Sequence, residues 1–273
     1  MGTQRDARVV ERSGESDLGR KRQSNQDRLL AEAPLFVVAD GMGGHKGGEV
    51  ASAMAVETFR EGFDRVTQSE PPAALQSLVK EANTRIFTRA SEDPDLKGMR
   101  TTLTAALVHD DAVTLAHVGD SRAYRLRGGK FELLTEDHSL VAELVRSGAV
   151  TPEEAEHHPQ RSLVLRALGS REDVEADVKT HGAQDGDVFL LCSDGLTKMV
   201  RDEQIVEVLG TAEQLEEATE RLVAAANEQG GDDNVTVCLF RLAVAAEENI
   251  RGQTTVVDHS VISRVATKER PRA

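Results

Sequence analysis

Several aspartates in this sequence stand where a run of apolar, strand-type residues begins or ends. Asp40 and Asp194 each close such a run and are followed by glycine, in the stretches FVVADG and VFLLCSDG. Asp120 ends LAHVGDS, Asp232-Asp233-Asn234 precede VTVCLF, and Asp27 precedes a pair of leucines. A single Asp-Gly pair is typical of a turn. Several carboxylates at strand ends instead predict a cluster, because the ends of neighbouring strands lie close together in a compact sheet core.

Carboxylates that meet in this way need cations between them. Two carboxylates about 4 Å apart repel by roughly 4 kcal/mol at an effective dielectric constant near 20, and divalent ions remove this repulsion. All the candidate ligands are oxygens, which favours Mg²⁺ or Mn²⁺ over zinc. The sequence contains no EF-hand loop, and the adjacent His157 and His158 face apart, so neither a calcium loop nor a histidine metal pair is predicted.

The composition indicates a globular protein and narrows the classes of partner. The 273 residues, of which 39% are hydrophobic, suffice for one large or two small domains. No run approaches 18 apolar residues, and the N-terminus lacks the apolar stretch of a signal peptide, so we expect a cytoplasmic protein without membrane contact. The net charge of −14 argues against nucleic acid as a partner. Cys192 and Cys238 lie in apolar runs and are expected to be buried, reduced thiols.

The periodicity predicts helices packed on antiparallel sheets. Strands are expected at 35–39, 103–108, 112–118, 122–127, 131–134, 187–192 and 235–240, and helices at 49–63, 73–88 and 212–226. Tight turns between the runs of 103–134 predict one antiparallel meander. Because the helices come in blocks between groups of strands, a doubly wound fold is disfavoured. Residues 243–273 lack aromatic residues and carry mixed charge, so we expect a folded domain over 1–242 followed by a tail or linker.

Ordered blocks of the sequence carry a family resemblance. The blocks are GRKRQSNQD (19–27), VVADGMGGHKGGEVAS (37–52), RTTLTA (100–105), VGDSRAY (118–124), TEDHSL (135–140), LVLRALG (163–169), CSDGL (192–196) and DNVT (233–236). Together, and in this order over about residues 10–242, they resemble the metal-dependent protein phosphatases known as PPM or PP2C, of the bacterial type.

The resemblance implies a fold, a reaction and a set of site residues. The implied fold is an α+β, four-layer α-β-β-α sandwich with two antiparallel sheets flanked by helices. The implied reaction is hydrolysis of phosphoserine and phosphothreonine on proteins, by attack of a water or hydroxide that bridges two Mn²⁺ or Mg²⁺ ions. Phosphorylated proteins made by Ser/Thr kinases would be the substrates of a monomeric enzyme. The resemblance implies that Asp40 bridges both ions and that the Gly41 carbonyl binds the first ion. Asp194 and Asp233 would complete the second ion, and Asp120 with Asp194 would hold a third, weaker ion. Arg22 would bind the substrate phosphate.

Three departures from the family pattern affect the expected site. Gln26 stands where many members have Glu. Gln26 and Asp27 are both expected to contact the metal ions through bound water. Because Gln26 carries an amide in place of a carboxylate, we expect the metal ions to be held more weakly. Met42 occupies the position of the histidine that animal members use to protonate the leaving group, which leaves His45 and a bound water as alternatives. Residues 139–162 match the family's variable flap, so no substrate contacts are assigned there.

Three other interpretations of the motifs are weaker. A thiol phosphatase of the C-x5-R type would place Lys198 at the arginine position after Cys192, with Asp194 repelling the incoming phosphate. The stretch GMGGHKGGE fails the spacing of a nucleotide-binding Walker loop, and its glycines are better explained by close backbone approach before a helix. A non-catalytic binding module of the same fold is disfavoured because Asp40, Asp194 and Asp233 are all present.

Overall fold

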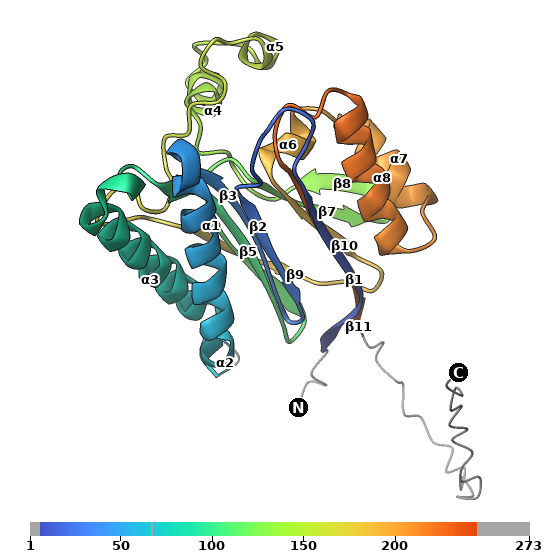
Figure 1. Cartoon of the computed structure of the whole chain (residues 1–273). Coiled ribbons are helices and arrows are strands. Elements are labelled where there is room, and N and C mark those ends of the chain that lie inside the picture. Colours follow the sequence, from blue (N-terminus) through green and yellow to red (C-terminus); the bar gives the residue numbers. More distant parts are fainter. Residues whose placement is uncertain (1–5, 67, 245–273) are drawn as a thin grey trace, which may run out of the picture.

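Two β-sheets lie face to face, and helices cover the outer face of each (Figure 1). The computed structural model describes residues 6–66 and 68–244, and for residues 44–46 it describes the backbone alone. The layer order is therefore α-β-β-α, the sandwich that the resemblance implies.

All strand pairs in the two sheets are antiparallel. The first sheet has the order β1-β11-β10-β7-β8, formed by β1 (Ala7–Asp17), β11 (Val235–Val244), β10 (Val188–Cys192), β7 (Arg122–Arg127) and β8 (Lys130–Leu133). The second has the order β2-β3-β5-β6-β9, formed by β2 (Asp27–Glu32), β3 (Leu35–Met42), β5 (Leu103–His109), β6 (Ala112–Val118) and β9 (Asp177–Gly182), with β4 (Arg100–Thr101) paired to the end of β3.

The helices fall into three groups (Figure 1). The second sheet is covered by α1 (Gly44–Glu61), α2 (Phe63–Val66), α3 (Pro71–Glu92) and the short 3-10 helix η1 (Pro94–Leu96). The first sheet is covered by α6 (Asp194–Thr197), α7 (Asp202–Thr211) and α8 (Leu215–Glu228). The flap, residues 139–162, contains α4 (Leu140–Arg146) and α5 (Pro152–Glu156) and projects from the top of the view.

The central strands are mostly apolar on both sides because both faces of each sheet are covered. In β3, Phe36 and Val38 point between the sheets, whereas the alternating Leu35 and Val37 pack under α1 and α3. Between the sheets the Phe36 ring stacks on Phe240 of β11 at a centroid distance of 4.1 Å. This packing fixes β3 and β11 side by side across the sandwich.

The expected strands and helices are present, with shifted helix boundaries. The predicted apolar stripe of 73–88 is buried within α3, and α1 begins at Gly44, ahead of the predicted 49–63. The predicted helix 212–226 is wrong at its start: Ala212 has an extended backbone that ends α7, and α8 begins at Leu215. The strands β1, β2, β4 and β9 were not expected.

The predicted single meander over 103–134 is wrong. β5 and β6 form a hairpin in the second sheet, whereas β7 and β8 form a hairpin in the first. The segment Gly119-Asp120-Ser121 crosses between the sheets. Gly119 makes this crossing with a φ of 116°, and a Cβ atom there would lie 2.6 Å from the Thr102 side chain. The crossing places Asp120 at the edge shared by both sheets.

Two further expectations concern the membrane and the tail. Among the described residues, no helix is both long and apolar enough to cross a bilayer. β11 continues to Val244, which pairs with Ala7, so the last strand runs two residues past the expected boundary at 242. The remainder of the expected tail lies outside the described residues.

Candidate metal centre

Asp27 and Asp40 face each other across two neighbouring strands. They are direct partners in the β2–β3 register, so their side chains lie on the same face of the sheet. Asp27 is only 2% exposed, and its Oδ2 accepts hydrogen bonds from Ser193 Oγ and Thr236 Oγ1, both at 2.7 Å. Thr236 lies in β11 of the other sheet, and Ser193 directly follows β10 of that sheet, so hydrogen bonds to this carboxylate link the two sheets at one edge.

Asp40 is the carboxylate on which the cluster centres. Its backbone is held by Thr102, whose Oγ1 accepts from the Asp40 N–H at 2.9 Å, and by Thr101, whose Oγ1 donates to the Asp40 carbonyl at 2.8 Å. Burial raises the pKa of Asp40 well above its ordinary value, and nearby carboxylates raise it further. Those carboxylates are Asp27, Asp194, Asp120 and Asp233. Five carboxylates from distant parts of the chain therefore interact at this edge.

The glycines after Asp40 and Asp194 allow the backbone to approach closely. A Cβ atom on Gly41 would overlap the carbonyl oxygen of Gly48 in α1, and one on Gly195 would overlap the carbonyl oxygen of Asn234. Neither glycine has a positive φ. Gly41 lies within β3 and Gly195 within α6, so neither Asp-Gly pair is a turn. Both glycines pack the strand ends together, which brings their aspartates into one cluster.

Asp194 and Asp120 each present an oxygen without a hydrogen-bond partner. Asp194 Oδ2 forms an ion pair with Lys198 Nζ, one helical turn later, whereas the buried Asp194 Oδ1 has no hydrogen-bond partner. Asp120 Oδ1 is likewise buried and lacks a hydrogen-bond partner. Burial and then the charge of Asp194 raise the pKa of Asp120 to about 7, with Lys198 acting in the opposite direction. Buried acceptors of this kind are unfavourable unless a ligand or an ion satisfies them.

Arg22 lies at the rim of the cluster, beside Asp233. Its Nη2 donates to Asp233 Oδ2 at 2.7 Å, and half of its side chain is exposed. Asn234 shapes the loop that carries Arg22: its Nδ2 donates to the carbonyls of Leu18 and Ser24, and its Oδ1 accepts from the Gln26 N–H. The guanidinium is therefore held at the rim of the cluster with part of its surface exposed.

The donor set fits divalent ions that prefer oxygen. The unpartnered oxygens of Asp120 and Asp194, and the raised pKa of Asp40, indicate a site where positive charge would relieve an unfavourable arrangement. Within the described residues, no group of three or more His, Cys, Asp or Glu side chains is arranged so that it could hold a metal ion. Asp194 and Asp233 each direct one oxygen to a cation of the protein, Lys198 and Arg22 respectively. The carboxylates meet at one edge, and their assignment as metal ligands stays a prediction.

The structure brings the sequence-predicted residues to one place, with two positions less defined. Gly41 follows Asp40 at the cluster, and the Gln26 carboxamide lies against Gly48 at the start of α1. Met42 is half-buried at the end of β3, where it pairs with Arg100. The side chain of His45 lies outside the described part of the chain, so the choice of proton donor stays open.

The thiol alternative does not fit the geometry. Cys192 is buried within β10 as a free thiol, and burial raises its pKa to about 12. Cys238 is also free and buried, as expected. A reactive cysteine needs an exposed thiolate with a lowered pKa, so Cys192 is a core residue.

Several residues of the centre were not expected from the sequence. Ser193 and Thr236 hold Asp27, Thr102 holds Asp40, and Lys198 neutralises part of Asp194. The i, i+4 spacing of Asp194 and Lys198 is a signal for Lys198, but only if residues 194–198 are known to be helical. The hydroxyl partners are separated from their aspartates by many residues and leave no local signal.

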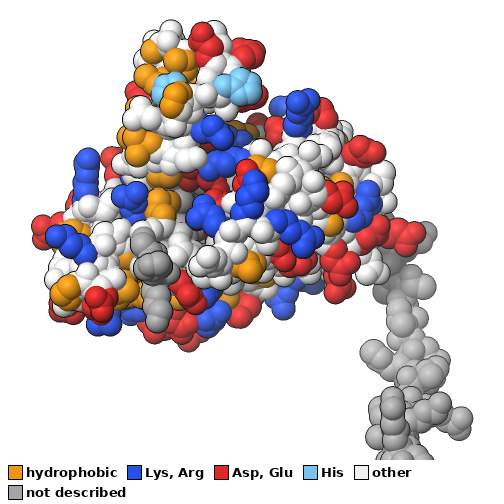
Figure 2. All heavy atoms as spheres, turned by 45° about the horizontal axis from the view of Figure 1, so that its top comes forward, with side chains coloured by type: hydrophobic (Ala, Val, Ile, Leu, Met, Phe, Trp, Pro, Cys, Tyr) orange, Lys and Arg blue, Asp and Glu red, His pale blue; other side chains and the backbone are white. Residues whose placement is uncertain are grey.

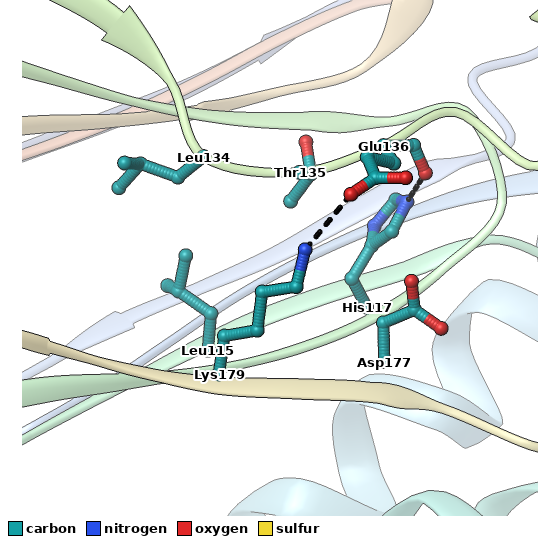
Figure 3. A pocket seen from close by; sticks show the side chains of 7 residues that line it. All are labelled: Leu115, His117, Leu134, Thr135, Glu136, Asp177 and Lys179. Carbon is teal, nitrogen blue, oxygen red and sulfur yellow. Dashed lines mark hydrogen bonds and ion pairs between the residues drawn. The ribbon is translucent and has the colours of Figure 1, made fainter. Parts of the chain in front are cut away.

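Two hollows lie away from the carboxylate cluster. One, of about 10 Å³, is lined by His117, Glu136, Asp177 and Lys179 and is closed by the Lys179–Glu136 ion pair (Figure 3). It has room for one water at most, and burial lowers the pKa of His117 there to about 4. The other, of about 520 Å³, lies between α4 and the segment 165–177. The larger hollow is a groove beside the flap.

The face around the centre carries positive charge despite the net charge of −14. Figure 2, in which the top of Figure 1 is turned forward, shows Lys and Arg side chains gathered beneath the projecting flap, with acidic side chains between them. Arg22 and Lys198 are among the cations that contact the cluster.

Comparisons with known proteins agree with this arrangement. The chain is 42% identical over 233 residues to the serine/threonine phosphatase stp of Listeria innocua, covering 82% of this chain and 92% of that protein. It is 44% identical over 229 residues to the serine/threonine protein phosphatase PstP of Mycobacterium tuberculosis, covering 84% of this chain and 44% of that longer protein.

Solved structures extend the comparison to the fold. A crystal structure of Mycobacterium tuberculosis PstP superposes with a TM-score of 0.83 at 42% identity, covering 86% of this chain and 100% of the other. The catalytic domain of PstP in complex with two manganese ions superposes with a TM-score of 0.80 at 39% identity, covering 88% and 99%. The family model described as protein phosphatase 2C matches residues 16–239. This chain belongs to the protein phosphatase 2C family.

Proposed function

We propose that this chain is a serine/threonine protein phosphatase that hydrolyses phosphoserine and phosphothreonine on proteins. Two Mn²⁺ or Mg²⁺ ions would be held by Asp40, Asp194, Asp233 and the Gly41 carbonyl. The names of the relatives and the two manganese ions in the PstP structure support this proposal.

One observation carries the proposal: five carboxylates from both sheets meet at a single edge beside an exposed arginine. Two of them, Asp120 and Asp194, keep buried oxygens that no protein group satisfies. Such a cluster raises carboxylate pKa values and destabilises the fold. A binding role for divalent ions explains why the chain retains it.

Each residue has a distinct part in the proposed reaction. Bound divalent ions supply an activated water nucleophile and neutralise charge on phosphate oxygens. Arg22 leaves one of its donors on Asp233 and turns the others toward the substrate, because a guanidinium binds a phosphate in bidentate fashion. Asp27, held by Ser193 and Thr236, keeps one oxygen available to orient water at the centre. Gln26 acts on the centre through its carboxamide.

The experiment that tests the function is hydrolysis of phosphopeptides by the full chain. With Mn²⁺ present, phosphoserine and phosphothreonine peptides should be hydrolysed in preference to phosphotyrosine peptides, and EDTA should stop turnover. Asp40→Asn should abolish the activity, whereas Asp111→Asn, an exposed turn residue, should retain it. A folded chain that binds peptide without hydrolysing it in millimolar Mn²⁺ would favour the non-catalytic binding module.

The proposal also covers the organisation of the chain and its setting. We extend the expected catalytic domain, residues 1–242, to the end of β11 at Val244, and treat the residues after it as a tail of a monomeric, cytoplasmic enzyme that acts on the products of Ser/Thr kinases. A truncation after Val244, which keeps β11 whole, should leave turnover on phosphopeptides unchanged. Sedimentation and cell fractionation test the monomeric state and the location.

A further inference from the structure

Lys198 occupies an unusual position for a lysine, because its ammonium lies among the carboxylates of the centre. Its Nζ forms an ion pair with Asp194 Oδ2, and its side chain is only 30% exposed. Its charge also interacts with Asp120 and Asp40. Lys198 is therefore an internal cation of the cluster.

The backbone fixes this position. Lys198 is the C-cap residue of α6, and its N–H donates to the Asp194 carbonyl at 2.9 Å. The two side chains are four residues apart on one face of the helical turn. At its other side the Lys198 ammonium reaches Ser162 Oγ, at the end of the flap, at 3.4 Å. The backbone of the turn and the flap contact thus favour the position of the ammonium at Asp194.

The charges of the centre balance with this lysine included. The five clustered carboxylates carry five negative charges when ionised. Two divalent ions and one ammonium carry five positive charges, so that the charge of Arg22, which also lies beside Asp233, is the excess available to the substrate phosphate. A third divalent ion in addition to Lys198 would place excess positive charge beside Asp194, whose Oδ2 is already taken.

We propose that the Lys198 ammonium, through its ion pair with Asp194, takes the place of a third metal ion at this carboxylate beside Asp120, so that this centre operates with two divalent ions. This inference rests on the proposed function, because it assumes that two ions bind at Asp40. A cation tethered by a short side chain has an effective concentration of about millimolar or more at its partner. A weakly held third ion would therefore have to compete with a cation that never diffuses away.

The test is the number of Mn²⁺ ions bound by the full chain, measured by equilibrium dialysis and by electron paramagnetic resonance of free Mn²⁺. Wild type should bind two ions and gain no third up to several millimolar Mn²⁺. Lys198→Met should bind the same two ions and acquire a third site. Adding Asp120→Asn to Lys198→Met should remove that third site, whereas Asp120→Asn alone should leave two ions bound.

Lys130→Met provides the matched control. Lys130 is exposed in the β7–β8 hairpin and has no ion pair, so its removal changes the net charge equally without touching the centre. This control should bind two ions. If Lys198→Met fails to fold, Lys198→Gln, which keeps the length and polarity of the side chain, serves in its place, and circular dichroism checks the fold of each variant.

The outcomes separate this inference from the proposed function. A wild-type chain that binds no Mn²⁺ overturns the proposed function. A wild-type chain that binds three ions overturns the role of Lys198 and leaves the function intact. Two ions in both wild type and the Lys198 variants, with no third site in either variant, also overturn the role of Lys198.

Discussion

Asp27 and Asp40 are opposed, residue to residue, across the β2–β3 pair, and both are carboxylates. Like charges directly opposite each other destabilise a sheet. Burial and neighbouring carboxylates accordingly raise the pKa of Asp27 to about 6, although hydrogen bonds from Ser193 and Thr236 act in the opposite direction. The fold therefore accepts an unfavourable arrangement at the edge where its proposed chemistry takes place.

This arrangement predicts a pH dependence of the metal-free chain. The pKa of Asp27 rises from 3.8 unfolded to about 6 folded, so its contribution to stability is fully present below pH 4 and is lost as the pH rises through 6. At about 1.4 kcal/mol per pKa unit, removing the charge with Asp27→Asn should gain about 2–3 kcal/mol more at pH 8 than at pH 4. Denaturant unfolding in EDTA measures this difference.

Comparing the unfolding free energies of wild type and Asp27→Asn separates the pH dependence caused by Asp27 from that caused by histidine. The pKa of buried His117 is lowered to about 4, mainly by burial, so its own contribution to stability falls as the pH falls below 6.5. This opposite dependence is common to both proteins and cancels in the difference. Equal effects of the variant at pH 4 and pH 8 would contradict the prediction.

Asp194→Asn should separate activity from stability. Loss of one proposed ligand should lower turnover on phosphopeptides by at least about 100-fold, by weakening the charge stabilisation of the transition state. The metal-free variant should stay folded, because the change removes one of five repelling carboxylates, although the loss of the Lys198 ion pair offsets part of that gain. Near-normal turnover at saturating Mn²⁺ would remove Asp194 from the site.

Gly41→Ala should disturb the fold around the centre. The new Cβ would overlap the Gly48 carbonyl oxygen, which belongs to rigid helical backbone. We expect a loss of several kcal/mol of unfolding free energy, about the size of other overpacking effects or larger. Gly210→Ala is the matched control: it lies in α7 with open space around it, and it should stabilise the chain by about 0.5–1 kcal/mol. Thermal and urea unfolding test both, and equal stability of the two variants would count against the close approach.

Arg22→Lys should weaken the grip on phosphate. A lysine ammonium lacks the planar fork of a guanidinium and cannot hold both Asp233 and a phosphate in bidentate geometry. We expect kcat/KM for phosphopeptides to fall about 10-fold or more, while Mn²⁺ binding measured by dialysis stays unchanged. Arg12→Lys, at an exposed position of β1, should leave both quantities as in wild type. Unchanged kcat/KM in Arg22→Lys would place the phosphate elsewhere.

Removal of metal and modification of thiols should have opposite results. EDTA should abolish turnover and added Mn²⁺ should restore it, because the proposed nucleophile depends on the ions. Iodoacetamide on the native chain should spare activity, since both thiols are buried and the pKa of each is raised to about 12 by burial. If iodoacetamide inactivated the enzyme and bound phosphate prevented this inactivation, the result would instead support a cysteine mechanism.

The sequence determined the chemical character of the centre and most of the core strands. The runs that became β3, β10 and β11 are mostly apolar, because both faces of each sheet are covered, and this signal is local. β1 and β9 were missed because they lie at the edges of their sheets and carry many polar residues. The positions of the aspartates at strand ends predicted that they cluster. Their preference for oxygen-binding ions follows from residue type alone.

Only the tertiary structure decided which strands share a sheet and which side chains meet. The turn at Gly119 reads as a hairpin, yet it crosses between the sheets, because pairing depends on packing between segments far apart in the chain. The same packing brings Ser193 and Thr236 to Asp27, and Lys198 into the cluster. Charge repulsion among the carboxylates arises only when these segments meet in the folded chain. The sequence therefore identifies the aspartates of the centre but does not determine the distances between them.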